Sequence, residues 1–169
     1  MSGFWSRLFG RSHRRRADRT HALFPASLQA LLDEREACLQ GIAVLVTDSG
    51  PVAHKFARMR LNVTLGRPCH HSTGYSGVTY IKRSRDWNAG EIDLLIVDTP
   101  ESLEDAGICY ASLSARAVVI LRGSDVQYPQ DSILLSSFRR DGWRQLPYRE
   151  GANATPARVW YRDGNFLGI

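Results

Sequence analysis

Two aspartates stand where a sheet-based site would place a reactive carboxylate. Asp48 and Asp98 follow the short apolar runs 42–46 and 92–97. A carboxylate at the end of a buried strand can act as a general base, bind a metal ion or contact a substrate amine. Each aspartate also has a simpler interpretation, as the cap of the helix that follows it. We take Asp98 as the candidate catalytic residue.

A thiol and two imidazoles stand together at Cys69, His70 and His71. Thiolate and imidazole are good metal ligands, but structural metal sites are usually built from spaced pairs of ligands, and no second cluster accompanies these three. We therefore expect a surface loop here and predict no metal site. Cys38 and Cys109 are far apart and form no CxxC pair, which indicates reduced thiols rather than a disulfide framework.

The elements that must position Asp48 and Asp98 are three continuous apolar runs, each ending in polar residues. The runs are 42–46, 92–97 and 117–121, and the polar clusters are 47–50, 98–101 and 122–125. Short runs of this kind are typical of strands buried on both faces of a parallel sheet. Ligands bind such sheets beyond the carboxyl ends of the strands, so the pattern predicts a crevice at that edge.

Helical spacing alternates with these runs. We expect helices over 27–39, 52–61, 103–113 and 132–140, a loop over 64–77, a brief strand at 78–81, and a closing antiparallel pair at 143–148 and 157–161. This order predicts one α/β domain over residues 26–169. Its expected form is a three-layer Rossmann-like sandwich whose mostly parallel sheet ends in an antiparallel hairpin.

Three stretches resemble the class I S-adenosylmethionine-dependent methyltransferases. They are the turn VTDSGPV at 46–52, the segment GVTYIKRSRDWNAGEIDLLIVDTP at 77–100, and the closing SFRRDGWRQLPYREGANATPARVWYR. The resemblance covers about residues 27 to 162. It implies cofactor contacts from Asp48 and Gly50, adenine contacts from Asp86 and Trp87, and a site carboxylate at Asp98.

This sequence also departs from the family pattern at several positions. Val52 occupies the place of the second glycine, where a Cβ is expected to crowd the cofactor. No acidic residue matches the one that would hold the ribose hydroxyls, and the short interval from Asp48 to Asp98 suggests a shortened or lost strand-helix unit. The predicted cofactor is therefore none or S-adenosylmethionine.

Two further families fit in part. A phospho-receiver domain would pair Asp48 with Asp98, but Thr47 stands where it needs a second acid and no lysine follows Lys82. A partition-type ATPase has a strand ending in Asp-Thr-Pro, yet GPVAHKF at 50–56 lacks the GK[ST] of a phosphate loop. A degenerate receiver or ATPase-like regulator stays open as an alternative.

The net charge of +5 belongs to the N-terminal tail, residues 1–25, which holds six arginines and one aspartate. The remaining residues carry equal numbers of basic and acidic side chains, which argues against a nucleic-acid-binding surface. The tail combines an apolar group with an arginine cluster; the residues are Phe4, Trp5, Leu8, Phe9, Arg14, Arg15 and Arg16. Such a segment fits an anionic membrane surface or a groove on a partner protein.

The sequence thus predicts a cytoplasmic, methyltransferase-like domain with an impaired cofactor site. We expect it to act as an accessory or scaffold protein, docked by its tail to a membrane surface or a larger assembly. An active S-adenosylmethionine-dependent methyltransferase is the alternative. An Arg-rich start is also found in organellar targeting peptides, so that destination stays open, whereas no segment reads as a secretory signal or a membrane span.

Overall fold

The computed structural model describes residues 22–47, 50–58, 62–65, 78–80, 87–123, 128–150 and 154–169. Seven strands form one sheet in the order β3-β2-β1-β4-β5-β7-β6. The strands are β1 (Ala43–Val46), β2 (Asn62–Leu65), β3 (Val78–Tyr80), β4 (Ile92–Val97), β5 (Leu113–Arg122), β6 (Arg144–Tyr148) and β7 (Ala157–Tyr161). All neighbouring pairs from β3 to β5 are parallel, while β7 runs antiparallel to both β5 and β6. This is the predicted fold class.

The apolar runs form the centre of the sheet, as expected. All six residues of β4 are buried, and the second half of β5 is buried on both faces. Side chains of consecutive residues point to opposite faces of a strand, so a continuous apolar run supplies two cores at once. Val44, Leu94 and Val118 face one core, and Leu45, Leu95 and Val119 face the other.

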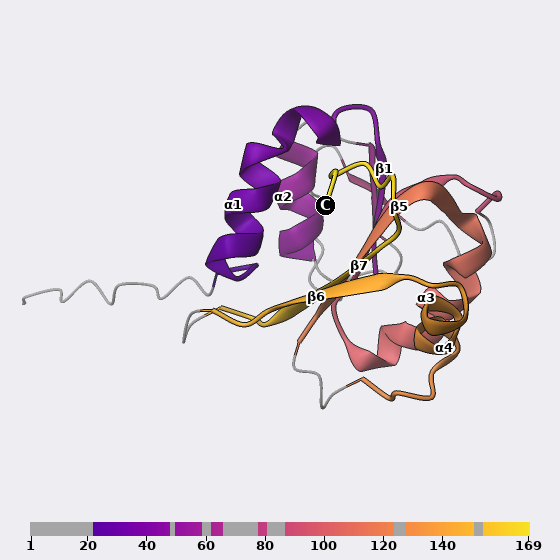
Figure 1. Cartoon of the computed structure of the whole chain (residues 1–169). Coiled ribbons are helices and arrows are strands. Elements are labelled where there is room, and N and C mark those ends of the chain that lie inside the picture. The colour runs from indigo at the N-terminus through magenta and orange to yellow at the C-terminus, as the bar shows by residue number, and fades with distance from the viewer. Residues whose placement is uncertain are drawn as a thin grey trace, which may run out of the picture.

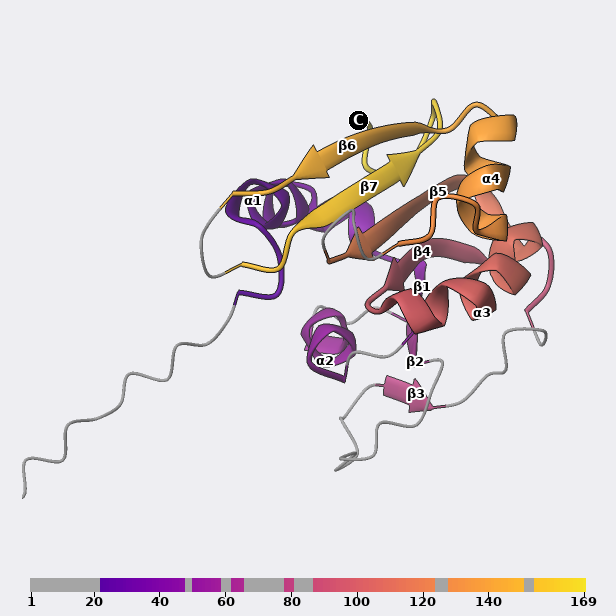
Figure 2. The same ribbon diagram turned by 90° about the horizontal axis from the view of Figure 1, so that it is seen from below.

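Helices cover both faces of the sheet, which gives the three layers seen in Figures 1 and 2. One face packs against α1 (Ala26–Glu34) and α2 (Gly50–Arg58), and the other against α3 (Leu103–Ile108) and α4 (Ile133–Arg140). Short 3-10 helices extend α1 and α3, at Glu36–Leu39 and Cys109–Ser112. Among the described residues, no helix is long and apolar enough to cross a membrane.

A second strand is present, so the strand of the unit that was expected to be shortened or lost is retained. β2 lies between β1 and β3, with Val63 paired to Val44 on one side and to Val78 on the other. The prediction that the loop begins at residue 64 was wrong, because residues 64 and 65 belong to β2; residues 66–77 lie outside the described part of the chain. Four residues with a single alternation of polar and apolar side chains give a weak sequence signal, and the backbone ladder to two neighbours defines the strand instead.

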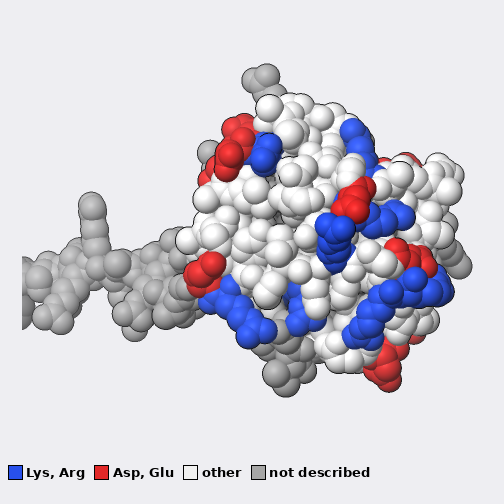
Figure 3. All heavy atoms as spheres, in the orientation of Figure 1, with Lys and Arg blue, Asp and Glu red and all other residues white. Residues whose placement is uncertain are grey.

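Charged side chains are interspersed over the face of the molecule seen in Figure 3. Basic and acidic groups lie close to one another there, with uncharged surface between them. The pattern agrees with the equal numbers of basic and acidic residues after position 25. Among the described residues on this face, basic groups have acidic groups near them.

The amino-terminal edge of the sheet is fastened by Asp93 in β4. Its carboxylate accepts hydrogen bonds from the Ala43 N–H at 3.2 Å, the Ser114 hydroxyl at 2.8 Å and the Arg116 guanidinium at 3.0 Å. The pairing of β4 with β5 shifts register at this point, so Asp93 joins three strand segments where the regular ladder is interrupted. Burial acts to raise the pKa of this carboxyl, but the hydrogen bonds from Arg116, Ser114 and Ala43 hold it below its usual 3.8.

Replacing Asp93 with Asn is expected to lower the free energy of unfolding by about 2 kcal/mol, because buried donors lose a charged acceptor. A carboxyl with a lowered folded-state pKa stabilises the protein above its unfolded-state pKa, and that contribution is lost as pH falls through the folded-state pKa. Urea unfolding from pH 7 down to about pH 2, which passes through the pH range below 3.8 where this contribution is lost, should therefore show a flatter acid limb for Asp93→Asn. Asp163→Asn, at an exposed ion pair, is the control and should change stability by less than about 0.5 kcal/mol. Equal effects of the two variants would contradict this role of Asp93.

Candidate functional site

The carboxyl ends of β1, β4 and β5 bring together three of the residues that the sequence placed at strand ends. They are Thr47, Asp98 and Arg122. The Asp98 N–H donates to the Thr47 hydroxyl at 3.3 Å, and the Thr47 N–H donates to the Ile96 carbonyl at 2.9 Å. The order of the strands along the chain reverses between the neighbours β1 and β4, and ligands bind beside such a reversal in open α/β sheets. Thr47, Asp98 and Arg122 therefore lie at the edge of the sheet where the crevice was predicted.

Asp98 is engaged in an ion pair with Arg122. The Arg122 guanidinium donates through Nη1 to Asp98 Oδ1, and the two side chains are only 7% and 20% exposed. The carboxylate is thus neutralised by a group of its own fold at the position where a catalytic base was predicted.

Arg122 also fastens the segment that precedes α1. Its Nε donates to the Leu23 carbonyl oxygen at 2.9 Å, and its guanidinium carbon lies 5.6 Å from the centre of the Phe24 ring. Phe24 is 1% exposed and carries a second cation, Lys55, at 5.4 Å from the same ring centre. Arg122 therefore joins β4, β5 and the start of the domain in one cluster.

Tyr128 closes the same edge from the opposite face of the sheet. Its hydroxyl lies within hydrogen-bond reach of the Arg122 and Val97 carbonyl oxygens, at 3.3 Å from the latter, and the side chain is 6% exposed. The last carbonyl groups of β4 and β5 therefore have a polar partner inside the protein.

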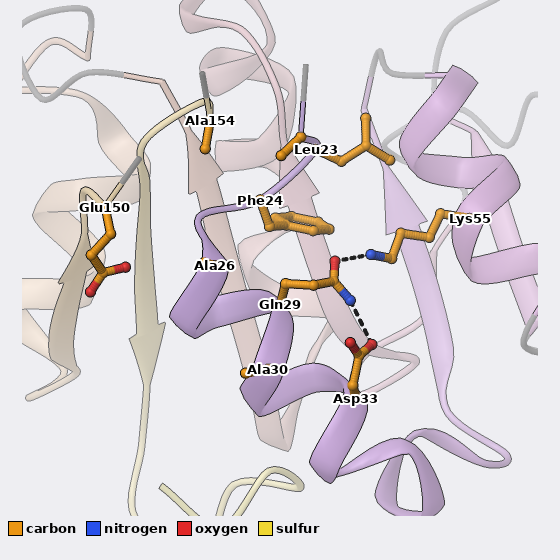
Figure 4. A pocket seen from close by; sticks show the side chains of 10 residues that line it. Leu23, Phe24, Ala26, Gln29, Ala30, Asp33, Lys55, Glu150 and Ala154 are labelled. Carbon is orange, nitrogen blue, oxygen red and sulfur yellow. Dashed lines mark hydrogen bonds between the residues drawn. The ribbon is translucent and has the colours of Figure 1, made fainter. Parts of the chain in front are cut away.

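A pocket of about 660 Å³ opens beside this cluster, between α1, α2 and the segment that joins β6 to β7 (Figure 4). Its walls are mostly small and apolar; the lining residues are Ala22, Leu23, Phe24, Ala26, Gln29, Ala30, Asp33, Lys55, Glu150 and Ala154. The Lys55 ammonium donates to Gln29 Oε1, and Gln29 Nε2 donates to Asp33 Oδ1 at 2.5 Å. Burial lowers the pKa of Lys55 below its usual range, and the nearby Asp33 carboxylate opposes part of that effect.

The residues predicted for the cofactor are only partly brought to this edge. Gly50 begins α2, and Val52 is fully buried in the core, so its side chain packs against the sheet. Trp87 lies at the amino-terminal edge, where its carbonyl oxygen accepts from the Ser112 hydroxyl at 3.2 Å just before β5. Trp87 and Asp98 therefore stand at opposite ends of the strands.

Several predicted site residues lie outside the described part of the chain. These are Asp48, Asp86, the Cys69–His70–His71 cluster, and the tail residues Phe4, Trp5, Leu8, Phe9, Arg14, Arg15 and Arg16. Cys38 and Cys109 are free thiols, as expected. Among the described residues, no group of three His, Cys, Asp or Glu side chains is arranged as a metal site.

Sequence reasoning missed the partners that define this edge. Arg122 was placed at a strand end but not paired with Asp98, because the two residues are 24 positions apart. Phe24 and Lys55 gave no motif at all. The available signal for Lys55 is compositional, since the chain contains two lysines among 22 basic residues.

The sequence matches no protein-family model and no curated protein. Solved structures with a similar fold include a ribosomal protein L11 methylase from Lactobacillus delbrueckii subsp. bulgaricus, at 17% identity and TM-score 0.55, over 80% of this chain and 78% of that one. An O-methyltransferase from Thermotoga maritima is similar at 11% identity and TM-score 0.56, over 81% and 65%. A precorrin-6y C5,15-methyltransferase from Geobacter metallireducens is similar at 10% and 0.54, over 79% and 89%.

These likenesses show the fold. The chain has the class I S-adenosylmethionine-dependent methyltransferase-like fold, as the resemblance implied, and it spans just under two thirds of the Thermotoga enzyme. The antiparallel β7 between β5 and β6 also separates this sheet from the all-parallel 2-1-3-4-5 order of receiver domains.

Replacing Arg122 with Met is expected to lower the free energy of unfolding by about 3 kcal/mol, because Asp98 would remain as a largely buried carboxylate without a cation. Asp98→Asn in the Arg122→Met background should recover part of that loss, and a double-mutant cycle by urea unfolding measures the coupling. Arg140→Met, at a 70% exposed side chain, is the matched control and should have little effect. A coupling energy near zero would show that the ion pair does not fasten this edge.

Proposed function

We propose that this chain is a methyltransferase-like domain that no longer performs group transfer and serves as an accessory or scaffold protein. The observation that carries the proposal is the ion pair between Asp98 and Arg122. A general base must be free to take a proton, and a carboxylate that binds a substrate amine must offer its charge to that amine. The negative charge of Asp98 is already paired with the Arg122 guanidinium.

The sequence around the other strands supports the same proposal. β2 ends at Leu65 and is followed by Gly66 and Arg67, and no Asp or Glu occurs between Asp48 and Asp86. In Rossmann-like folds a carboxylate shortly after a strand holds the ribose hydroxyls of the cofactor. The carboxylate is missing from the place after β2 where the family resemblance would put it. A weakened or lost affinity for S-adenosylmethionine follows.

An active S-adenosylmethionine-dependent methyltransferase is the second candidate. Its support is the strand order and fold, which this chain shares with solved structures that are named as methyltransferases. In that case Asp48 and Gly50 would hold the cofactor, with Asp86 beside the adenine, and the substrate would reach the edge near Asp98. Trp87 is less suited to this role because it stands at the opposite edge.

The N-terminal tail is the docking element in this proposal. Its aromatic residues and arginine cluster suit an anionic membrane surface, where each cation near the headgroups contributes about 1 kcal/mol. A groove on a partner protein is the other destination. The interspersed charges on the face seen in Figure 3 support a role for the tail, rather than that face, in binding an anionic partner.

Calorimetric titration with S-adenosylmethionine and S-adenosylhomocysteine separates the two candidates. We expect no saturable heat at about 1 mM of either ligand, which corresponds to a binding free energy weaker than about 4 kcal/mol. Binding in the micromolar range that is abolished by Asp48→Ala would instead select the active enzyme. Arg140→Met, at a 70% exposed side chain, is the control and should leave the titration unchanged.

Deleting residues 2–20 tests the docking role. The full chain should co-sediment with vesicles that contain anionic lipid, and binding should weaken as salt screens the arginines. The truncated chain should stay in the supernatant with an unchanged unfolding midpoint. If the truncated chain sediments as well as the full chain, the tail is not the docking element. If neither sediments, the anionic membrane is excluded as the destination.

A further inference from the structure

Lysine is almost absent from this chain, which makes the position of one of its two lysines informative. Of 22 basic residues, only Lys55 and Lys82 are lysines, and the rest are arginines. Arginine cannot serve as a nucleophile because its guanidinium stays protonated, whereas a lysine amine reacts once it loses its proton. Lys55 lines the pocket beside α1.

The pocket has the size and lining of a small-molecule site. Its volume of about 660 Å³ lies within the usual range for ligand pockets. Alanines at 22, 26, 30 and 154 form much of the wall, and the Phe24 ring centre lies 5.4 Å from the Lys55 amine and 5.6 Å from the Arg122 guanidinium. Figure 4 shows the Lys55 side chain reaching across from α2 toward Gln29 on α1. An apolar ring or short alkyl body fits such walls.

The charges around Lys55 favour a neutral ligand. Asp33 and Glu150 line the same pocket as Lys55, so the lining holds two carboxylates and one ammonium. The two carboxylates would repel an anionic ligand. A cation held at the Lys55 nitrogen, by contrast, gains from the Asp33 carboxylate and from the Phe24 ring.

We propose that this pocket binds a small, neutral aldehyde or ketone with an apolar body, and holds it as a Schiff base on Lys55. The neutral amine attacks the carbonyl carbon, the resulting carbinolamine loses one water molecule, and a C=N bond replaces the C=O bond. The proton released by the ammonium at the start passes to solvent and can return to the imine nitrogen as the iminium forms. No oxidant or reductant takes part, and the proposal holds whether or not the domain binds S-adenosylmethionine.

The lowered pKa of Lys55 assists the first step. Burial makes the ammonium less stable than in water, so a larger share of the amine is neutral at a given pH. Once the iminium has formed, the Asp33 carboxylate and the Phe24 ring stabilise its positive charge without having to move.

Reductive trapping on the full-length protein tests the proposal. The protein is incubated with benzaldehyde and cyanoborohydride, and peptide mass spectrometry measures the labelling of Lys55 and Lys82. Lys55 should be labelled several-fold faster than Lys82, and its rate should saturate with benzaldehyde concentration. The ratio of Lys55 to Lys82 labelling should fall with 4-carboxybenzaldehyde, which differs by one anionic group.

Ala30→Phe is the matched variant, because Ala30 is an exposed wall residue on α1 and a larger side chain there narrows the pocket. It should abolish saturation with benzaldehyde but leave labelling of Lys55 by formaldehyde in place, with an unchanged unfolding midpoint. Equal labelling of the two lysines, or a Lys55 rate that rises linearly with benzaldehyde and is the same in Ala30→Phe, would overturn the proposal.

Discussion

The buried guanidinium of Arg122 is the constraint on which the carboxyl edge of this domain depends. A charge that is 7% exposed must be paired and hydrogen-bonded, and Arg122 meets that requirement with Asp98 from β4 and the Leu23 carbonyl from the start of the domain. Each of these partners is thereby fixed in place. Because Arg122 is bonded to Leu23 and lies beside the Phe24 ring, it also helps to position Phe24, which forms one wall of the pocket.

Each of the two edges of the sheet contains a charged side chain that joins neighbouring segments, an anion at one edge and a cation at the other. At the amino edge an anion, Asp93, gathers donors from β1 and β5, and at the carboxyl edge a cation gathers acceptors from β4 and the chain before α1. Both arrangements connect β4 with a neighbouring strand where the backbone ladder is interrupted or ends. A site whose charges are all matched internally is stable, but it offers few unpaired groups to a ligand.

The strong sequence signals were the continuous apolar runs, and they predicted the centre of the sheet because such runs can only be buried on both faces. β4 begins and ends where the pattern predicted. The weak signals failed for a physical reason: β2 is defined by hydrogen bonds to β1 and β3, which a pattern of side chains does not encode. The Asp98 and Arg122 strand ends were predicted, but their pairing depends on which strands are neighbours, and that is a property of topology.

The root of the N-terminal tail is attached at a defined place on the domain. Ala22 forms a parallel bridge with Ala154, and Leu23 is held by Arg122. The residues before Ala22 therefore start from the rim of the pocket rather than from a remote loop. Any surface that captures the tail will therefore keep the rim of the pocket near that surface. The pocket would then sample molecules within or near that surface at a far higher local concentration than molecules in bulk solvent.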